Sequence, residues 1–241
     1  MIEAPIERPK IKIYADGAIL DDMKKLLATG YVSVFTTNPS LMRIVGTNDY
    51  LAYAKKLATE LPEHPLSLEV LADTLPEMER QAHILRELGK NIYVKIPCIN
   101  TKGESTGPLV KKLSDAGIAL NLTAIMHMSQ VVDLVPFVNP KTPTVFSLFA
   151  GRIADVGRDP LPMMHAARAL LSAHSPAWEL LWASCREVWN VFEAERCGCD
   201  IITAPGDVIK KLKDLSKPSL EVSLEAVRIF ADDAKASGFS F

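Results

Sequence analysis

Short runs of apolar residues alternate along this chain with longer stretches in which apolar positions repeat at helical spacing. Eight runs have the length of buried strands, at 11–15, 32–35, 66–70, 92–96, 118–122, 144–146, 180–183 and 201–203. The longer stretches predict helices over 50–61, 73–88, 108–116, 129–135, 162–173, 187–196 and 207–215. Regular alternation of this kind predicts parallel strands joined by crossover helices.

Eight strand–helix units within 241 residues match the size of a (β/α)8 barrel. A doubly wound open sheet is the structural alternative, but the glycine-rich turn typical of that fold is missing from the sequence. No linker or low-complexity segment divides the chain. We therefore expect a single α/β domain over 1–241, a (β/α)8 TIM barrel with a C-terminal helical extension over 219–241. An amphipathic stretch at 220–236 predicts the helix of that extension.

Charge and composition limit which binding partners and which cellular compartment we expect for this protein. The 27 Lys and Arg residues nearly balance the 29 Asp and Glu residues, which gives no bulk reason to bind nucleic acid or an anionic membrane. The first residues lack the pattern of a signal peptide, and no apolar run is long enough to span a bilayer. The four cysteines and five histidines show no metal-ligand or redox spacing. We expect a cytoplasmic protein with reduced thiols and neither metal nor cofactor.

Polar side chains stand at or just after the end of every predicted strand. In chain order they are Asp16, Thr36, Asn38, Glu69, Lys95, Asn121, Thr123, Ser147, Arg152, Ser184, Arg186 and Thr203. Barrel enzymes carry their chemistry at the carboxyl ends of the strands. The sequence therefore predicts a functional site at that end of the barrel.

Strand alternation indicates which of these side chains point toward the barrel axis. Ile92, Val94 and Ile96 share one strand face, so Lys95 lies on the opposite, inward face, and the same reasoning turns Glu69 inward. A lone strand lysine is more often exposed. Polar groups at matching levels of the other strands favour a site instead, because so polar a centre is costly unless it binds something. Desolvation favours a neutral amine, which can attack a carbonyl to form a Schiff base.

Two carboxylates have two readings each. Glu69 either forms a structural ion pair with Lys95 or orients a water, anchored also by Thr123, that relays protons during Schiff-base formation. Asp16 either removes a hydroxyl proton beside a breaking carbon–carbon bond or caps the helix that follows.

Arg152 and Arg186 follow neighbouring strands, where barrels often bind phosphate. Each arginine by itself would be read as a surface residue. Together with the Ser184 hydroxyl, the two guanidinium groups can hold a phosphate or another tetrahedral anion.

Five segments of the chain, in order, resemble those of the transaldolase family. They are TTNPS at 36–40, VKIP at 94–97, NLT at 121–123, SLFAGRI at 147–153 and ASCR at 183–186, and the resemblance spans roughly 11–212. It implies a class I aldolase-type barrel of the pentose phosphate pathway. Such an enzyme transfers a dihydroxyacetone unit from a ketose phosphate, sedoheptulose 7-phosphate or fructose 6-phosphate, to an aldose phosphate through a lysine Schiff base.

The resemblance also implies roles for individual residues. The catalytic set would be Lys95, Glu69, Asp16 and Thr123. The substrate-binding set would be Thr36, Asn38, Asn121, Ser147, Phe149, Arg152, Ser184 and Arg186.

The short chain and its trailing helix are similar to the small subfamily that includes fructose-6-phosphate aldolases. That subfamily implies a ring-shaped homo-oligomer, a pentamer or decamer, in which the terminal helix packs on a neighbour. Glu69, Asn121 and Phe149 instead resemble true transaldolases, since the aldolases carry Gln, a small residue and Tyr there. Departures from both groups at Cys98, 126–128 and 155–159 leave alternatives open. These are a fructose-6-phosphate aldolase, a transaldolase for specialised sugars including sulfo-sugars, and a silent sugar-phosphate-binding barrel.

Overall fold

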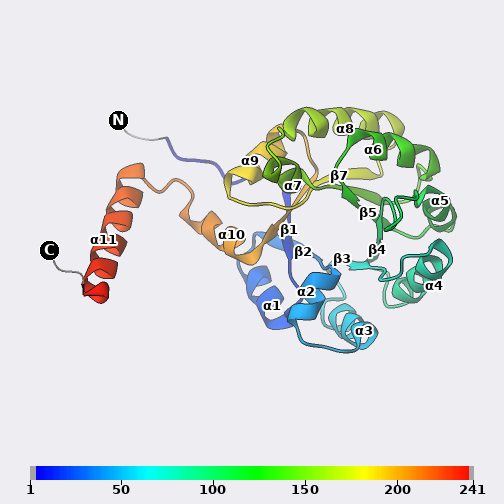
Figure 1. The fold of residues 1–241 in the computed structure, drawn as a ribbon, viewed down its shortest axis with the longest axis horizontal. Coiled ribbons are helices and arrows are strands. Elements are labelled where there is room, and N and C mark those ends of the chain that lie inside the picture. Colours follow the sequence, from blue (N-terminus) through cyan, green and yellow to red (C-terminus); the bar gives the residue numbers. More distant parts are fainter. Residues whose placement is uncertain (1–3, 239–241) are drawn as a thin grey trace. The chain divides into compact units, whose positions relative to one another are not determined.

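The computed structural model describes residues 4–238, and its strands pair in chain order into a closed, all-parallel barrel (Figure 1). The strands are β1 (Lys12–Asp16), β2 (Val32–Thr36), β3 (Leu66–Glu69), β4 (Ile92–Pro97), β5 (Leu120–Ile125), β6 (Thr144–Leu148), β7 (Trp178–Trp182) and β8 (Ile201–Pro205). The predicted (β/α)8 barrel is thereby confirmed, with every predicted strand within a few residues of its observed position.

Helices follow the strands, and in Figure 1 those between consecutive strands surround the barrel. The helices of the chain are α1 (Leu20–Ala28), α2 (Pro39–Ile44), α3 (Tyr50–Glu60), α4 (Leu75–Arg86), α5 (Gly107–Asp115), α6 (Met128–Leu134), α7 (Ala150–Asp155), α8 (Leu161–His174), α9 (Trp189–Arg196), α10 (Gly206–Lys211) and α11 (Ser219–Ser237), with short 3-10 turns η1 (Val135–Phe137) and η2 (Leu212–Asp214). The sequence pattern did not indicate α1, α2 or α7. The six residues of α2 and of α7 are too few for an apolar repeat to be recognised.

Helix α4 illustrates why an amphipathic stretch folds where it does. Its apolar face buries Met78, Ala82 and Leu85 against the barrel. The Thr74 side chain makes no capping hydrogen bond, and the Asp73 carboxylate instead accepts hydrogen bonds from Thr101 in the loop after β4. The Asp73 carboxylate therefore holds the loop after β4 to the start of α4 instead of capping the helix.

The barrel interior changes from apolar to polar toward the carboxyl ends of the strands. An apolar layer contains Tyr14, Val34, Val145, Leu181 and Ile201, which come from β1, β2, β6, β7 and β8. The residues two positions further along β1, β2, β6 and β8 are Asp16, Thr36, Ser147 and Thr203. The register of the sheet also pairs Glu69 with Lys95 and Lys95 with Asn121 on adjacent strands. The apolar layer and the polar layer nearer the carboxyl ends therefore lie on the same inward strand face, two residues apart along each strand.

The chain divides into two compact units. One unit, Pro9–Lys210, contains the barrel, and the other comprises Met1–Arg8 with Lys211–Phe241. Within the second unit, the Ser216 hydroxyl accepts a hydrogen bond from the Ile6 backbone amide, and α11 forms the predicted terminal helix. The last residues of the predicted extension, 239–241, lie outside the described part of the chain. Among residues 4–238, no helix has the length and apolar character needed to cross a membrane.

Candidate active site

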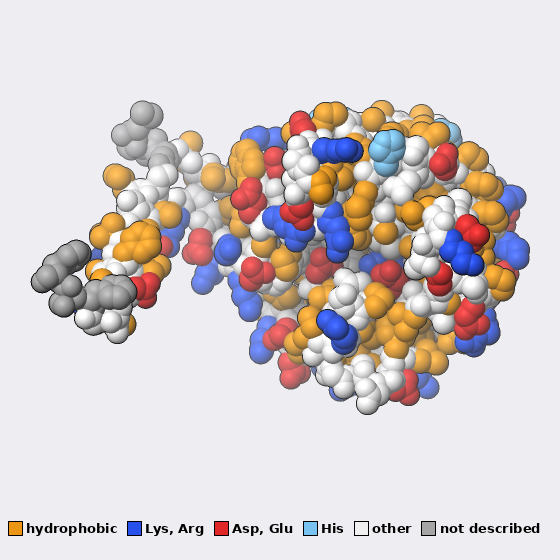
Figure 2. Space-filling view, in the orientation of Figure 1, with side chains coloured by type: hydrophobic (Ala, Val, Ile, Leu, Met, Phe, Trp, Pro, Cys, Tyr) orange, Lys and Arg blue, Asp and Glu red, His pale blue; other side chains and the backbone are white. Residues whose placement is uncertain are grey.

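A cavity of about 250 Å³ opens at the carboxyl ends of the strands. It is lined by every sequence-predicted site residue except Glu69, namely Asp16, Thr36, Asn38, Lys95, Asn121, Thr123, Ser147, Phe149, Arg152, Ser184 and Arg186. Figure 2 views the barrel from this end and shows a hollow at which basic and acidic side chains gather. The structure therefore brings these side chains together around one cavity, and their functional roles stay predictions.

Lys95 is the buried lysine of this cavity, with only 7% of its surface exposed. Its Nζ lies 3.2 Å from Oε2 of Glu69 and donates a hydrogen bond of 2.9 Å to the backbone carbonyl of Thr37. The two contacts hold the amine in a fixed position on the cavity wall. Glu69 reaches Lys95 from the neighbouring strand because the register of β3 and β4 pairs the two residues directly.

Asp16 ends β1 beside the same cavity, and its carboxylate accepts a hydrogen bond from the Thr36 hydroxyl. The Thr36 hydroxyl also lies 2.8 Å from that of Thr203, so three strands meet at this carboxylate. Helix α1 begins at Leu20 and has no side-chain cap. The alternative reading of Asp16 as an N-cap is therefore wrong, and its carboxylate belongs to the cavity.

A second polar network crosses the cavity between β6, β5 and β3. The Ser147 hydroxyl donates to Oδ1 of Asn121 at 2.7 Å, and Nδ2 of Asn121 donates to the Ser67 hydroxyl at 3.1 Å. Sequence reasoning missed Ser67, although it stands two residues before Glu69 and therefore on the same strand face. Oδ1 of Asn38 accepts from the Leu41 amide, so this side chain also caps α2.

Thr123 is held by an irregular end of β5. Its side chain is buried, and its Oγ1 makes no hydrogen bond with the described protein atoms. The following residue, Ala124, has a φ of 60°, where the strand register shifts. Cys98 fixes this bulge, since its amide donates to the Thr123 carbonyl at 2.9 Å and its thiol to the Ala124 carbonyl. A buried hydroxyl without a protein partner points to a small polar molecule as its partner.

At the other side of the cavity, α7 packs tightly against the loop after β7. A Cβ atom on Gly151 would lie 1.7 Å from the carbonyl oxygen of Ser184, so only glycine fits there. Ser184 itself has a φ of 66°, a strained conformation of the kind found at functional sites. Arg152 in α7, whose guanidinium lies 5.8 Å from the centre of the Phe149 ring, and Arg186 in the loop after β7 both line the cavity.

The thiols near the cavity are poor nucleophiles. Burial raises the pKa of Cys185, which lines the cavity, to about 12 and that of Cys98 to about 11. Both therefore stay protonated at neutral pH, and the thiolate is the reactive form. Lys95 is the stronger candidate for a nucleophile in the cavity.

Fold and cavity together define a (β/α)8 barrel protein with a polar site, centred on a buried lysine, at the carboxyl ends of its strands. The family model described as "Transaldolase/Fructose-6-phosphate aldolase" matches residues 13–240. The chain belongs to this family.

Curated relatives agree with the family assignment. A probable transaldolase of Methanococcus maripaludis strain C6 is 33% identical over 202 residues, covering 84% of this chain and 89% of the relative. One from Ruegeria sp. strain TM1040 is 31% identical over 228 residues, covering 95% and 98%. Among solved structures, one named "Native KDPGal structure" has a TM-score of 0.57 at 10% identity, covering 92% of this chain and 98% of that one. A 3-hexulose-6-phosphate synthase also has a TM-score of 0.57, at 15% identity with 84% and 98% coverage. These two structures share the fold alone.

Proposed function

We propose that this protein is a transaldolase that transfers a dihydroxyacetone unit from a ketose phosphate to an aldose phosphate through a Schiff base on Lys95. The carrying observation is the position of Lys95, which is buried, held beside Glu69 at 3.2 Å and placed in one cavity with Asp16. Sedoheptulose 7-phosphate and fructose 6-phosphate are the proposed donors.

The first half of the reaction forms the covalent intermediate. Glu69 takes a proton from the Lys95 ammonium, and the neutral Nζ attacks the ketose carbonyl carbon to form a carbinolamine. A water held by Thr123 and Glu69 passes a proton to the carbinolamine hydroxyl, which leaves as water and gives the Schiff base. The otherwise unpartnered Thr123 hydroxyl supports this water position.

The second half breaks and reforms a carbon–carbon bond. The Asp16 carboxylate takes the proton of the hydroxyl beside the breaking bond, and the aldose leaves. The electrons of that bond form the carbon–carbon double bond of an enamine, the three-carbon unit attached to Lys95, while the π electrons of the Schiff base become the lone pair on Nζ. The enamine then attacks the acceptor aldehyde, Asp16 returns its proton to the new hydroxyl, and water hydrolyses the Schiff base. The hydrogen bond from Thr36 orients the Asp16 carboxylate for both proton transfers.

We assign binding roles from the polar side chains that line the cavity. We assign the three-carbon unit to Asn38, Asn121 and Ser147, which present amide and hydroxyl groups near Lys95. The far phosphate is assigned to Arg152, Ser184 and Arg186, because guanidinium groups bind such anions with charge-assisted hydrogen bonds.

Borohydride trapping tests the proposal directly. Incubation with fructose 6-phosphate and borohydride should inactivate the protein and leave a three-carbon adduct on Lys95, identified by peptide mass spectrometry. The Lys95→Arg variant should not be trapped. An unmodified Lys95 in the inactivated protein, or full trapping of the variant, would refute the mechanism.

A fructose-6-phosphate aldolase is the second candidate, because the matched family model covers both activities. Phe149 favours transfer, because its ring lines the cavity and carries no hydroxyl. A hydroxyl at this position would help to hold the water that protonates the enamine. One such hydroxyl contact is worth about 0.5–1.5 kcal/mol, or roughly three- to tenfold in the partitioning of the enamine between release and transfer.

We expect Phe149→Tyr to raise release of free dihydroxyacetone and to lower transfer to erythrose 4-phosphate. If the unmodified protein already releases dihydroxyacetone faster than it transfers it, the aldolase is the correct assignment.

We also propose a homo-oligomer in which α11 contributes to the interface. Leu220, Leu224, Val227 and Phe230 form an apolar stripe along this helix, and each is exposed. Stripes of this kind are normally buried against another surface. Light scattering should therefore show a smaller assembly for a chain ending at Pro218 than for the full chain, and an unchanged assembly mass would refute the proposal.

A further inference from the structure

An acidic residue pairs with one of the two arginines that line the cavity. Asp155 lies three residues after Arg152 on α7, and its carboxylate forms an ion pair with the guanidinium of Arg186. Both partners of the pair are about half exposed, at 53% for Arg186 and 49% for Asp155. The proposed function gives Asp155 no role.

The backbone around this pair is fixed by packing. Gly151 in α7 contacts the Ser184 carbonyl so closely that no larger residue fits. The amide of Arg186 donates a hydrogen bond of 2.9 Å to Oδ1 of Asn190 in α9. Helix α7 and the loop after β7 therefore hold their positions relative to each other, and Asp155 stays within reach of Arg186.

The carboxylate changes the charge that a bound anion meets. Arg152 and Arg186 together carry two positive charges, and Asp155 cancels one of them. An anion that contacts Arg186 must also share that guanidinium with the carboxylate. A phosphate ester carries close to two negative charges above its second pKa near 6, whereas a sulfate ester of the same shape carries one. Repulsion from Asp155 therefore acts about twice as strongly on the phosphate ester.

We propose that Asp155 is a specificity-determining residue. Its negative charge lowers kcat/KM more for sugars with a dianionic phosphate ester at the far end than for sugars with a singly charged group there. The inference rests on the proposed function, since it concerns the anion end of that same site. Sugars with one negative charge at the far end are the substrate class that Asp155 disfavours less. A merely supporting role for Asp155, holding Arg186 in place, would have the opposite consequence, because its loss would then weaken binding of the phosphate ester.

The test compares fructose 6-phosphate with fructose 6-sulfate as donors at pH 7.5, with uncharged erythrose as the acceptor. In Asp155→Asn the ratio of kcat/KM for phosphate over sulfate should rise by about three- to tenfold, because one nearby negative charge is removed. The ratio is unaffected by the fraction of folded enzyme. A ratio that stays unchanged or falls overturns the inference.

Asp115→Asn is the matched control. Asp115 forms an exposed ion pair with Lys111 on α5 and is 47% exposed, close to the exposure of Asp155. It ends a helix that returns from the carboxyl end of β4 toward the amino ends of the strands, so it lies away from the cavity. Its loss should leave the ratio unchanged, and a rise equal to that of Asp155→Asn would show a general charge effect and overturn the inference.

A separate readout distinguishes failure of this inference from failure of the proposed function. Dihydroxyacetone has no far anion, so its borohydride trapping on Lys95 should be the same in the unmodified protein and in Asp155→Asn. Absence of trapping in both refutes the Schiff-base function itself. Equal trapping with an unmoved phosphate-to-sulfate ratio refutes only the role of Asp155.

Discussion

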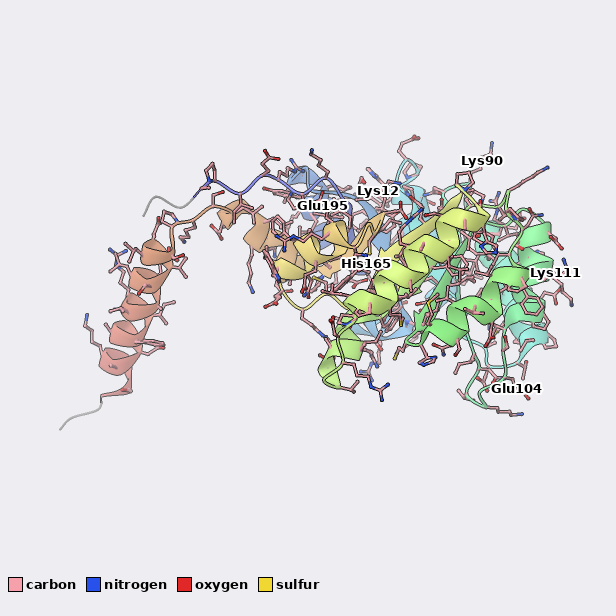
Figure 3. The ribbon with its side chains drawn as sticks, turned by 90° about the horizontal axis from the view of Figure 1, so that it is seen from above. Lys12, Lys90, Glu104, Lys111, His165 and Glu195 are labelled. Atoms are coloured by element: carbon pink, nitrogen blue, oxygen red, sulfur yellow. The ribbon has the colours of Figure 1, made fainter. Side chains whose placement is uncertain are left out.

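Two lysine–glutamate pairs occupy opposite ends of the same barrel. Lys12 of β1 pairs with Glu179 of β7 near the amino ends of the strands, and Lys95 of β4 pairs with Glu69 of β3 near the carboxyl ends. Figure 3 labels Lys12 and Lys90 at one end of the barrel and Glu104 at the other. The lysine side chain is 59% exposed in the first pair and 9% in the second. The same two residue types therefore experience different solvation within one barrel.

The surroundings of the two pairs explain why only one is suited to chemistry. The Glu179 carboxylate raises the pKa of Lys12, and solvent reaches the pair, so this lysine stays a hydrated cation. Lys95 is held from two sides and faces a cavity that also contains Asp16 and Thr123. Position along the strand, rather than residue type, separates a surface ion pair from a candidate nucleophile.

Replacing each lysine by methionine gives the largest expected contrast. Lys95→Met removes the proposed covalent route and should lower kcat by on the order of 10⁴-fold or more. Lys12→Met should change kcat less than about twofold, because an exposed ion pair contributes little. Steady-state kinetics with far-UV circular dichroism as a folding check measures both. Comparable losses in the two variants would show that position along the strand does not distinguish the pairs.

Replacing each glutamate by glutamine tests proton transfer with little change in shape. Glu69→Gln should slow Schiff-base formation by about 10²-fold or more, the usual contribution of a general acid–base group. Glu179→Gln serves as the control and should trap at the normal rate. Quenched-flow borohydride trapping gives these rates. The relay assignment fails if Glu69→Gln traps substrate as fast as the unmodified protein.

Two buried threonines sharpen the comparison between activity and stability. Thr123→Val should reduce turnover by about three- to tenfold, and it should leave stability unchanged or raise it by up to about 1 kcal/mol, because the lost hydroxyl has no protein partner. Thr144→Val, at the amino end of β6, should lose about 1 kcal/mol of stability and no activity, since its hydroxyl donates to the Thr142 carbonyl. Urea unfolding and kinetics on both variants decide, and a stability loss without an activity loss in Thr123→Val contradicts the assignment.

The smallest expected effect concerns pH. The folded-state pKa of Lys12 is raised, so its pair stabilises the protein fully below the unfolded pKa near 10.4, and this contribution is lost as pH rises through the folded value. Because the lysine is exposed, solvent screening limits the contribution to about 1 kcal/mol or less. The difference in unfolding free energy between the unmodified protein and Lys12→Met should be present at pH 9 and shrink near pH 11.5. A difference that grows with pH would reverse the assigned sign.

Much of the site could be predicted because successive side chains of a strand point to opposite faces of the sheet. The apolar neighbours of Lys95 and Glu69 were enough to predict that both side chains point toward the barrel axis. In the structure, Nζ of Lys95 lies 3.2 Å from Oε2 of Glu69. The same rule would have found Ser67. It could not choose between the two readings of Asp16, because capping depends on where the next helix starts, and α1 starts at Leu20 without using the carboxylate.

Other features depend on contacts between segments far apart in the chain. The pairing of Asp155 with Arg186 joins residues 31 positions apart, and neither residue type nor spacing indicates it. Gly151 must be glycine only because the Ser184 carbonyl approaches it. The Thr123 hydroxyl lacks a protein partner only because the bulge at Ala124 sets the end of β5.

The sequence by itself determined the barrel, the end at which its polar residues gather, and the inward direction of its lysine, because these follow from local periodicity. Only the tertiary structure decided which lysine–glutamate pair is buried, which carboxylate meets which arginine, and which hydroxyl lacks a protein partner. Those outcomes depend on the register between strands and on close approaches between loops. Both arise when the barrel closes and cannot be read from one segment alone.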